Sequence, residues 1–222
     1  MLIRSVVLAA ALAMAGSAAA ATGDQSLQTR NPALRIQWAG DQTRTPPFDK
    51  VLLAPVELEF RPVPPMTGPP GGLSTRTEFP VSDRDREDLS KTFAEIFRDE
   101  LGHNKHFTLT DQPGPGVLLV KPSLRDIVSR VPPEEPIGRS RVYLDSVGDA
   151  TLVVDLVDSE SGTTLGSATD RRTAKPAATI NDFGNVRAVP PETTAEVRRL
   201  ARRWATNLDK RLEQLYFEAK PR

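Results

Sequence analysis

Residues 82–101 carry apolar side chains at steps of three and four, the spacing typical of an amphipathic helix. Ser82 is expected to cap its N-terminus, because the hydroxyl can accept a hydrogen bond from one of the first backbone N–H groups. Gly102 is expected to end the helix, since glycine readily adopts the backbone conformations that terminate helices. The buried stripe would consist of Leu89, Phe93, Ile96, Phe97 and Leu101.

A second, longer helix is predicted from Glu192 to about Phe217. Pro190 and Pro191 lead into it, and its apolar residues again recur with helical periodicity. They would form a buried stripe of Val197, Leu200, Ala201, Trp204, Leu208, Leu212 and Leu215.

Alternating apolar and polar residues predict a strand over residues 150–157, and the turn cluster at 158–162 would connect it to a returning strand at 163–172. The apolar face of this hairpin would consist of Ala150, Leu152, Val154 and Leu156. Further strands are predicted at Asp49–Phe60, Phe107–Thr110 and Val117–Val131. Pro55 interrupts the first of these, which indicates a sheet edge or a bulge at that point.

The element order β-α-β-β-β-β-α predicts an α+β domain of two layers. We expect a mostly antiparallel sheet of about five strands, with two amphipathic helices on one face. The domain would span residues 48–218 and follow an extended arm at residues 22–47. Three loops are predicted, at residues 61–72, 132–138 and 173–191.

The first 21 residues have the organisation of a secretory signal peptide. Arg4 supplies the positive start, Ser5–Ala15 is almost entirely apolar, and Ala18-Ala19-Ala20 offers the small residues that a signal peptidase accepts. Cleavage is therefore expected after Ala20 or Ala21, and the Ala-rich style is typical of bacteria. The alternative is a retained membrane anchor, but the strongly apolar stretch is about ten residues long and a bilayer requires about 20.

Composition narrows the possible functions. The 222 residues include 29 Lys+Arg and 29 Asp+Glu, and this balance argues against a nucleic-acid-binding protein. The chain has no Cys, which excludes disulfides, thiolate metal sites, a Cys nucleophile and a lipid-modified N-terminal Cys. We expect a protein that is exported to the periplasm or the medium and has no transmembrane helix after signal cleavage. Any attachment to the outer membrane would be peripheral.

Several segments, taken in order and spacing, resemble one bacterial family. They are Pro-Gly-Pro-Gly-Val-Leu-Leu-Val at 113–120, Leu-Arg-Asp-Ile at 124–127, Ala-Thr-Leu-Val-Val-Asp at 150–155, Val-Asp-Ser-Glu-Ser-Gly at 157–162 and Ala-Arg-Arg-Trp-Ala at 201–205. Over about residues 48–217 the chain resembles the family known as domain of unknown function 3313 (DUF3313). The resemblance implies an exported cell-envelope protein, often a lipoprotein, and this chain departs from the lipoprotein pattern because it lacks Cys. It implies no activity and no catalytic residues.

Few residues are candidates for catalysis or metal binding. His103 and His106 lie three residues apart, but two imidazoles without nearby carboxylates make a poor zinc site, so capping or solvated roles are favoured. Ser159 and Ser161 are better explained as turn residues than as nucleophiles. The carboxylates of the hairpin could form an acid–base pair, although a solvated sheet face is favoured. These carboxylates are Asp145, Asp149, Asp155 and Asp158.

The closing helix carries a basic stripe of Arg198, Arg199, Arg202 and Arg203, two adjacent pairs one turn apart. Such a stripe can dock onto anionic lipid or an acidic partner. The alternative is an ordinary solvated helix face balanced by the acidic residues of the same helix, Glu192, Glu196, Asp209 and Glu213.

The sequence therefore favours a non-catalytic binding or structural module of the cell envelope. Its contact surfaces would be the loops at 61–72 and 132–138 and the basic helix face, and its partner an envelope protein or an anionic surface. No cofactor, metal or nucleic acid is expected, and the sequence does not predict whether the protein is a monomer or an oligomer. The alternatives are an exported hydrolase that uses the carboxylates of residues 149–158, and a peripheral membrane-binding protein that uses the basic helix.

Overall fold

The computed structural model describes residues 34–64, 77–132, 143–175, 186–187 and 190–220. Within these residues it contains two helices, α1 (Asp83–Gly102) and α2 (Pro190–Ala219). The strands are β1 (Ile36–Trp38), β2 (Lys50–Leu53), β3 (Glu57–Phe60), β4 (Thr108–Thr110), β5 (Val117–Ser129), β6 (Tyr143–Leu144), β7 (Gly148–Asp158), β8 (Thr164–Ala174) and β9 (Val186–Arg187). The predicted signal peptide, residues 22–33 of the arm and most of the loops at 61–72, 132–138 and 173–191 lie outside the described residues.

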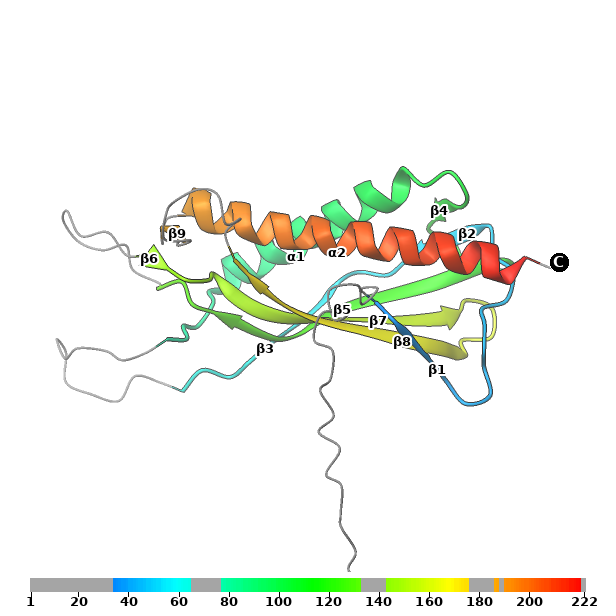
Figure 1. The fold of residues 1–222 in the computed structure, drawn as a ribbon, viewed down its shortest axis with the longest axis horizontal. Helices are drawn as coiled ribbons and strands as arrows, with labels where there is room; N and C mark the ends of the chain where they lie inside the picture. Colours follow the sequence, from blue (N-terminus) through cyan, green and yellow to red (C-terminus); the bar gives the residue numbers. More distant parts are fainter. Residues whose placement is uncertain (1–33, 65–76, 133–142, 176–185, 188–189, 221–222) are drawn as a thin grey trace, which may run out of the picture. The chain divides into compact units, whose positions relative to one another are not determined.

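Seven of the described strands form one sheet in the order β1-β8-β7-β5-β2-β4, with β3 also paired to β5 (Figure 1). The antiparallel hairpin of β7 and β8 is confirmed, and β5 runs antiparallel to β7 over most of its length. Strands β6 and β9 form a separate antiparallel pair. The α+β class with two helices is thus confirmed.

The prediction of a mostly antiparallel sheet of about five strands is wrong in its details. Strands β2 and β3 both pair parallel to β5, and β4 pairs parallel to β2, so the sheet is mixed. Helix α1 lies between β3 and β5 in the chain, and a helical crossover returns the chain to pair in the parallel direction. Residues 36–38, part of the expected arm, form the edge strand β1 against β8.

The strand expected at 49–60 is divided at the position that Pro55 indicates. Strand β2 pairs with the first third of β5, residues 54–56 interrupt the ladder, and β3 then pairs with a later part of β5. Proline lacks the N–H group that a ladder needs. The two short strands therefore lie end to end along the same partner.

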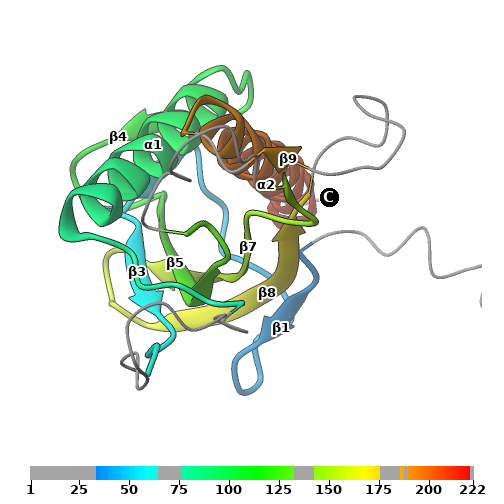
Figure 2. The ribbon, with the colours of Figure 1, turned by 90° about the vertical axis from the view of Figure 1, so that its left-hand side faces the viewer.

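Both helices cover the same face of the sheet, as the view in Figure 2 shows. The predicted apolar face of β7 is buried beneath them, with Leu152 fully buried and Val154 only 1 % exposed. On α2, Trp204 and Leu212 are fully buried within the same core. On the opposite face of the sheet, charged side chains such as Arg125 and Arg171 are exposed.

Helix α1 begins and ends where the sequence predicts. The backbone N–H of Asp85 donates to the Ser82 hydroxyl at 3.2 Å, and two acidic residues occupy the first turn, where the helix dipole favours negative charge. The helix ends at Gly102. Helix α2 extends two residues beyond the predicted limits at each end, from Pro190 to Ala219.

Neither helix in the described part of the chain is long and apolar enough to cross a lipid bilayer.

Candidate functional site

Helices α1 and α2 run in the same general direction and cross obliquely as they pack on the sheet (Figure 1). The rings of Phe93 and Trp204 lie 6.1 Å apart between their centroids, and further along both helices Asn104, just after α1, donates to Asp209 of α2 at 2.7 Å. Residue numbers thus rise together along the two helices. This packing leaves a groove between their outer surfaces.

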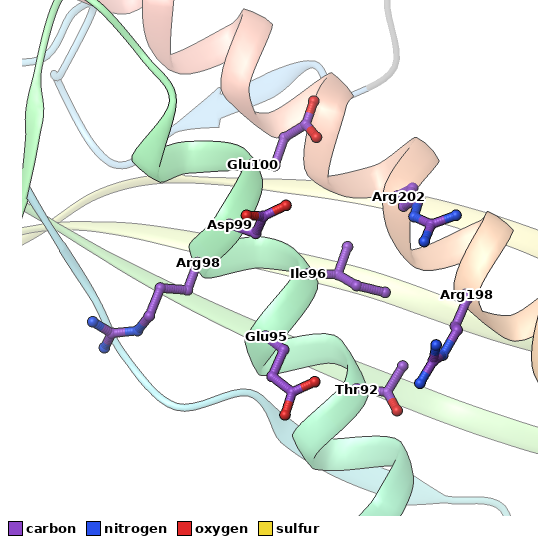
Figure 3. Close-up of a pocket in the computed structure, with 8 residues that line it drawn as sticks. All are labelled: Thr92, Glu95, Ile96, Arg98, Asp99, Glu100, Arg198 and Arg202. Atoms are coloured by element: carbon purple, nitrogen blue, oxygen red, sulfur yellow. The ribbon is translucent and has the colours of Figure 1, made fainter.

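The groove has a volume of about 590 Å³ (Figure 3). Six of its lining residues come from α1 and two from α2, and Ile96 points from α1 toward α2. A volume of this size lies within the range of sites that hold a small molecule or a few side chains of a partner. The lining residues are Thr92, Glu95, Ile96, Arg98, Asp99, Glu100, Arg198 and Arg202.

Two residues of the predicted basic stripe, Arg198 and Arg202, form the α2 wall of this groove. They lie one turn apart and are both exposed. Neither guanidinium has a hydrogen-bond or ion-pair partner among the residues that the structure describes. Their charge is therefore available to a group that enters the groove from outside.

The other two arginines of the stripe are placed differently. Arg199 donates to the carboxylate of Glu196, which is only 5 % exposed, so its charge is compensated within the helix. Arg203 is exposed but does not line the groove. The structure thus divides the stripe of four into a pair facing the groove and a pair outside it.

The α1 wall carries charges of the opposite sign. Glu95 and Asp99 are exposed and one turn apart, like the two arginines across the groove. The remaining charged residues of this wall are engaged within the molecule: Arg98 points away from α2 toward Asp111, and Glu100 accepts a hydrogen bond from Thr206 at 2.7 Å. This acidic wall was not predicted from the sequence.

The structure does not bring the hairpin carboxylates into the groove. Asp158 accepts a hydrogen bond from the Ser161 hydroxyl in the turn, and Asp155 lies on the sheet face opposite the helices. Asp149 accepts from Thr173 and pairs with Arg130. Asp145 lies beyond β6, outside the paired region of the hairpin.

The environment of Asp149 favours its charged form. Burial acts to raise the pKa of this carboxyl, but the hydrogen bonds from Thr173 and Arg130 outweigh burial, so the pKa lies below its usual value. A carboxylate held in this way is a poor general acid. Its contacts are those of a residue that ties strands together.

The two histidines have different partners and do not form a joint site. The Nδ1 atom of His103 is 2.6 Å from the carbonyl oxygen of Asp99, at the end of α1. The Nε2 atom of His106 is 3.0 Å from Oε1 of Glu213 on α2. In the described residues no group of three or more His, Cys, Asp or Glu side chains is arranged to hold a metal ion.

A charged network on the open sheet face was not predicted. Arg61, just after β3, donates two hydrogen bonds of 2.7 Å to the carboxylate of Asp126, and Arg171 of β8 donates a third. Asp126 lies at the bulge of β5 and adopts a φ of 52°, a left-handed conformation that aspartate tolerates better than most residues. Arg61 also pairs with Glu78, so this ion pair connects the start and the end of the segment between β3 and α1.

No curated protein sequence matches the chain. The family model described as "Protein of unknown function (DUF3313)" matches residues 20–208. The chain belongs to the DUF3313 family. This confirms the resemblance drawn from the sequence, and the family's description assigns no function.

Solved structures similar to this DUF3313 protein share little sequence with it. The PelC dodecamer from Paraburkholderia phytofirmans is 9 % identical, with a TM-score of 0.34 over 78 % of this chain and 97 % of its own. A Xanthomonas campestris protein of the DUF330 family is 13 % identical, with a TM-score of 0.41 over 84 % of this chain and 95 % of its own. Values this low do not define a function.

The Asp126 network gives this DUF3313 protein a predictable dependence on pH. The hydrogen bonds from Arg61 and Arg171 hold the pKa of Asp126 well below its usual value. A depressed pKa contributes stability above the unfolded-state pKa of about 3.9, and this contribution is lost as the pH falls through the folded value. Asp126→Asn should therefore lower the free energy of unfolding at pH 7, by about 1 kcal/mol because the network is half exposed.

The measurement is urea unfolding followed by circular dichroism at several pH values. The difference in free energy of unfolding between the wild type and Asp126→Asn should shrink as the pH falls below about 4. Asparagine keeps the tolerance for positive φ, so the substitution changes charge rather than backbone strain. Asp155→Asn, on the same sheet face, is the control and should have little effect. A difference that stays constant across this pH range would contradict the assignment.

Proposed function

We propose that this DUF3313 protein is an exported, non-catalytic binding module of the bacterial cell envelope, and that it contacts a partner through the groove between α1 and α2. The observation that carries the proposal is the pair Arg198 and Arg202, which line the groove without an internal partner in the described structure. Exposed guanidinium groups held one turn apart on a rigid helix suit docking to a surface that presents carboxylates or other anions.

The proposal of export rests on the first 21 residues. Their positive start, apolar run and small-residue site are those of a cleavable signal peptide. The absence of Cys removes the residue on which a bacterial lipid anchor is built, so we place the cleaved protein in the periplasm, held at a membrane only through a partner.

The chemistry of the groove supports binding better than turnover. Its charged walls lack a histidine or a nucleophile paired with a base among the lining residues, and such a pair is the usual basis of hydrolysis. The hairpin carboxylates on which a hydrolase would depend are held apart, and Asp149 and Asp158 already accept hydrogen bonds within the chain. The groove can therefore recognise charge without performing a reaction.

The experiment is site-specific photo-crosslinking of the full chain in a bacterial cell. A crosslinking amino acid at Thr92, in the groove, should give an adduct in the periplasmic fraction, whereas one at Thr169, exposed on β8, should not. The adduct should be lost with the double substitution Arg198→Glu and Arg202→Glu. It should persist with Arg203→Glu, which reverses one charge on the same helix outside the groove.

The same cells test export. Mass spectrometry of the periplasmic protein should give a chain that begins at Ala21 or Thr22. An uncleaved chain in the cytoplasmic fraction would overturn the proposed location. Adducts that form equally at Thr169, or that survive reversal of both groove arginines, would overturn the proposed surface.

A further inference from the structure

The two walls of the groove carry opposite charges, and this restricts the kinds of surface that can bind there. The α2 wall presents Arg198 and Arg202, and the α1 wall presents Glu95 and Asp99. A uniformly anionic surface, such as a bilayer of acidic lipid, would be attracted to one wall and repelled by the other. The matching partner must itself carry acidic and basic rows side by side.

The spacing of the two charge pairs is the same. Glu95 and Asp99 lie one helical turn apart on α1, and Arg198 and Arg202 lie one turn apart on α2. All four side chains are exposed. Apart from a 3.9 Å approach between Asp99 and the imidazole of His103, these side chains make no ion pair within the described part of the chain. Each row could therefore pair with the opposite row of another molecule.

A second copy of this chain carries both rows in the required arrangement. Because α1 and α2 run in the same general direction, a two-fold axis that bisects their directions and passes over the groove exchanges the two helices without reversing them. The basic α2 wall of one copy then lies over the acidic α1 wall of the other, and the same contact is made twice. Ile96 would lie near the axis, between the charged rows.

We propose that the partner of the α1–α2 groove is a second copy of this protein, bound as a symmetric dimer through the pairs Glu95/Asp99 and Arg198/Arg202. The inference rests on the proposed function, since it names the partner of the same surface. Two helices of this length offer a strip of at most about 30 Å by roughly 20 Å, on the order of 600 Å² per copy. Stable interfaces bury about 800 Å² per partner, so the dimer should be weak and sensitive to salt.

The experiment is sedimentation equilibrium of the full chain over about 1–200 μM, a range that covers a micromolar dissociation constant. The wild type should dimerise at an ionic strength of roughly 0.05 M and dissociate on raising it to about 0.5 M, because exposed ion pairs are screened. The double variant Arg198→Glu, Arg202→Glu should raise the dissociation constant by at least about tenfold. Glu95→Arg, Asp99→Arg should do the same, and Arg203→Glu should not.

The decisive variant combines all four substitutions. It restores opposite charges on the two walls and has the same formal net charge as the wild type, so non-specific attraction cannot explain its behaviour. It should dimerise with itself and not with the wild type, whose corresponding walls now carry like charges. Thermal unfolding followed by circular dichroism checks that each variant folds, which is expected because all four residues are exposed.

A wild type that stays monomeric at low salt, or a fourfold variant that does not dimerise, would overturn the inference. So would an equal loss of dimer with Arg203→Glu. These outcomes are distinct from failure of the proposed function: a monomeric protein that still forms groove-specific adducts with another macromolecule keeps the function and loses the dimer. A groove-specific adduct of the chain with itself supports both.

Discussion

Replacement of Trp204 by alanine is expected to lower the free energy of unfolding by about 3–5 kcal/mol. The Trp204 side chain is fully buried between α2 and the sheet, where it meets the ring of Phe93. Its removal leaves a cavity that the neighbouring helix and strands can fill only in part. It also removes the hydrogen bond that the indole Nε1–H donates to Asp170 at 2.9 Å.

Urea unfolding followed by far-ultraviolet circular dichroism measures this loss, since fluorescence would change with the indole itself. Trp204→Phe separates the two contributions, because it keeps most of the volume and loses the hydrogen bond, and it should cost less than Trp204→Ala. Phe217→Ala removes an aromatic ring that is 53 % exposed and serves as the control, with an expected loss below about 1 kcal/mol. Equal losses for Trp204→Ala and Phe217→Ala would contradict the described core.

Gly148→Ala is expected to lower the free energy of unfolding by a similar amount, because it adds an atom where no space exists, whereas Trp204→Ala leaves a cavity. Gly148 begins β7, and a Cβ atom at this position would overlap the carbonyl oxygen of Val128 and lie 3.1 Å from its carbonyl carbon. Both contacts are with the backbone of β5, so relief requires that the two strands separate. We expect a loss of about 3 kcal/mol, at the upper end of the usual cost of overpacking.

The matched control is Gly102→Ala at the end of α1. There the added Cβ would meet only Cδ1 of Leu109, at 3.9 Å, which is an ordinary van der Waals contact. Alanine also favours the helix more than glycine does, so this variant should be as stable as the wild type or slightly more stable. If Gly148→Ala and Gly102→Ala unfold at the same urea concentration, β5 and β7 do not approach each other as described.

The candidate site was only partly foreseeable from sequence. The two helical turns that carry Arg198 and Arg202 stand out because adjacent basic pairs recur at helical spacing within one element. Glu95 and Asp99 lie about a hundred positions earlier, in a helix whose acidic residues resemble those of any solvated face. Their placement across a groove depends on how the two helices pack, and local patterns do not encode that contact.

The network around Asp126 illustrates the same limit. Arg61 and Asp126 are 65 residues apart, and Arg171 follows 45 residues later. No periodic pattern links such positions, because Asp126 and Arg171 lie in different strands and Arg61 directly follows a third. They meet only when β3, β5 and β8 have taken their places in one sheet and the bulge of β5 has turned the carboxylate toward both guanidinium groups.

The sequence alone determined the local elements: helix α1 with its Ser82 cap, the apolar stripe of α2, the hairpin of β7 and β8, and the break at Pro55. These follow from periodicity, capping and backbone chemistry, which act over a few residues. Tertiary structure alone decided that β2 and β3 pair parallel to β5, that residues 36–38 add an edge strand, and that opposite charges face each other across the α1–α2 groove. Those outcomes depend on which distant surfaces bury one another, since the burial of apolar area is non-directional and selects partners only in the assembled fold.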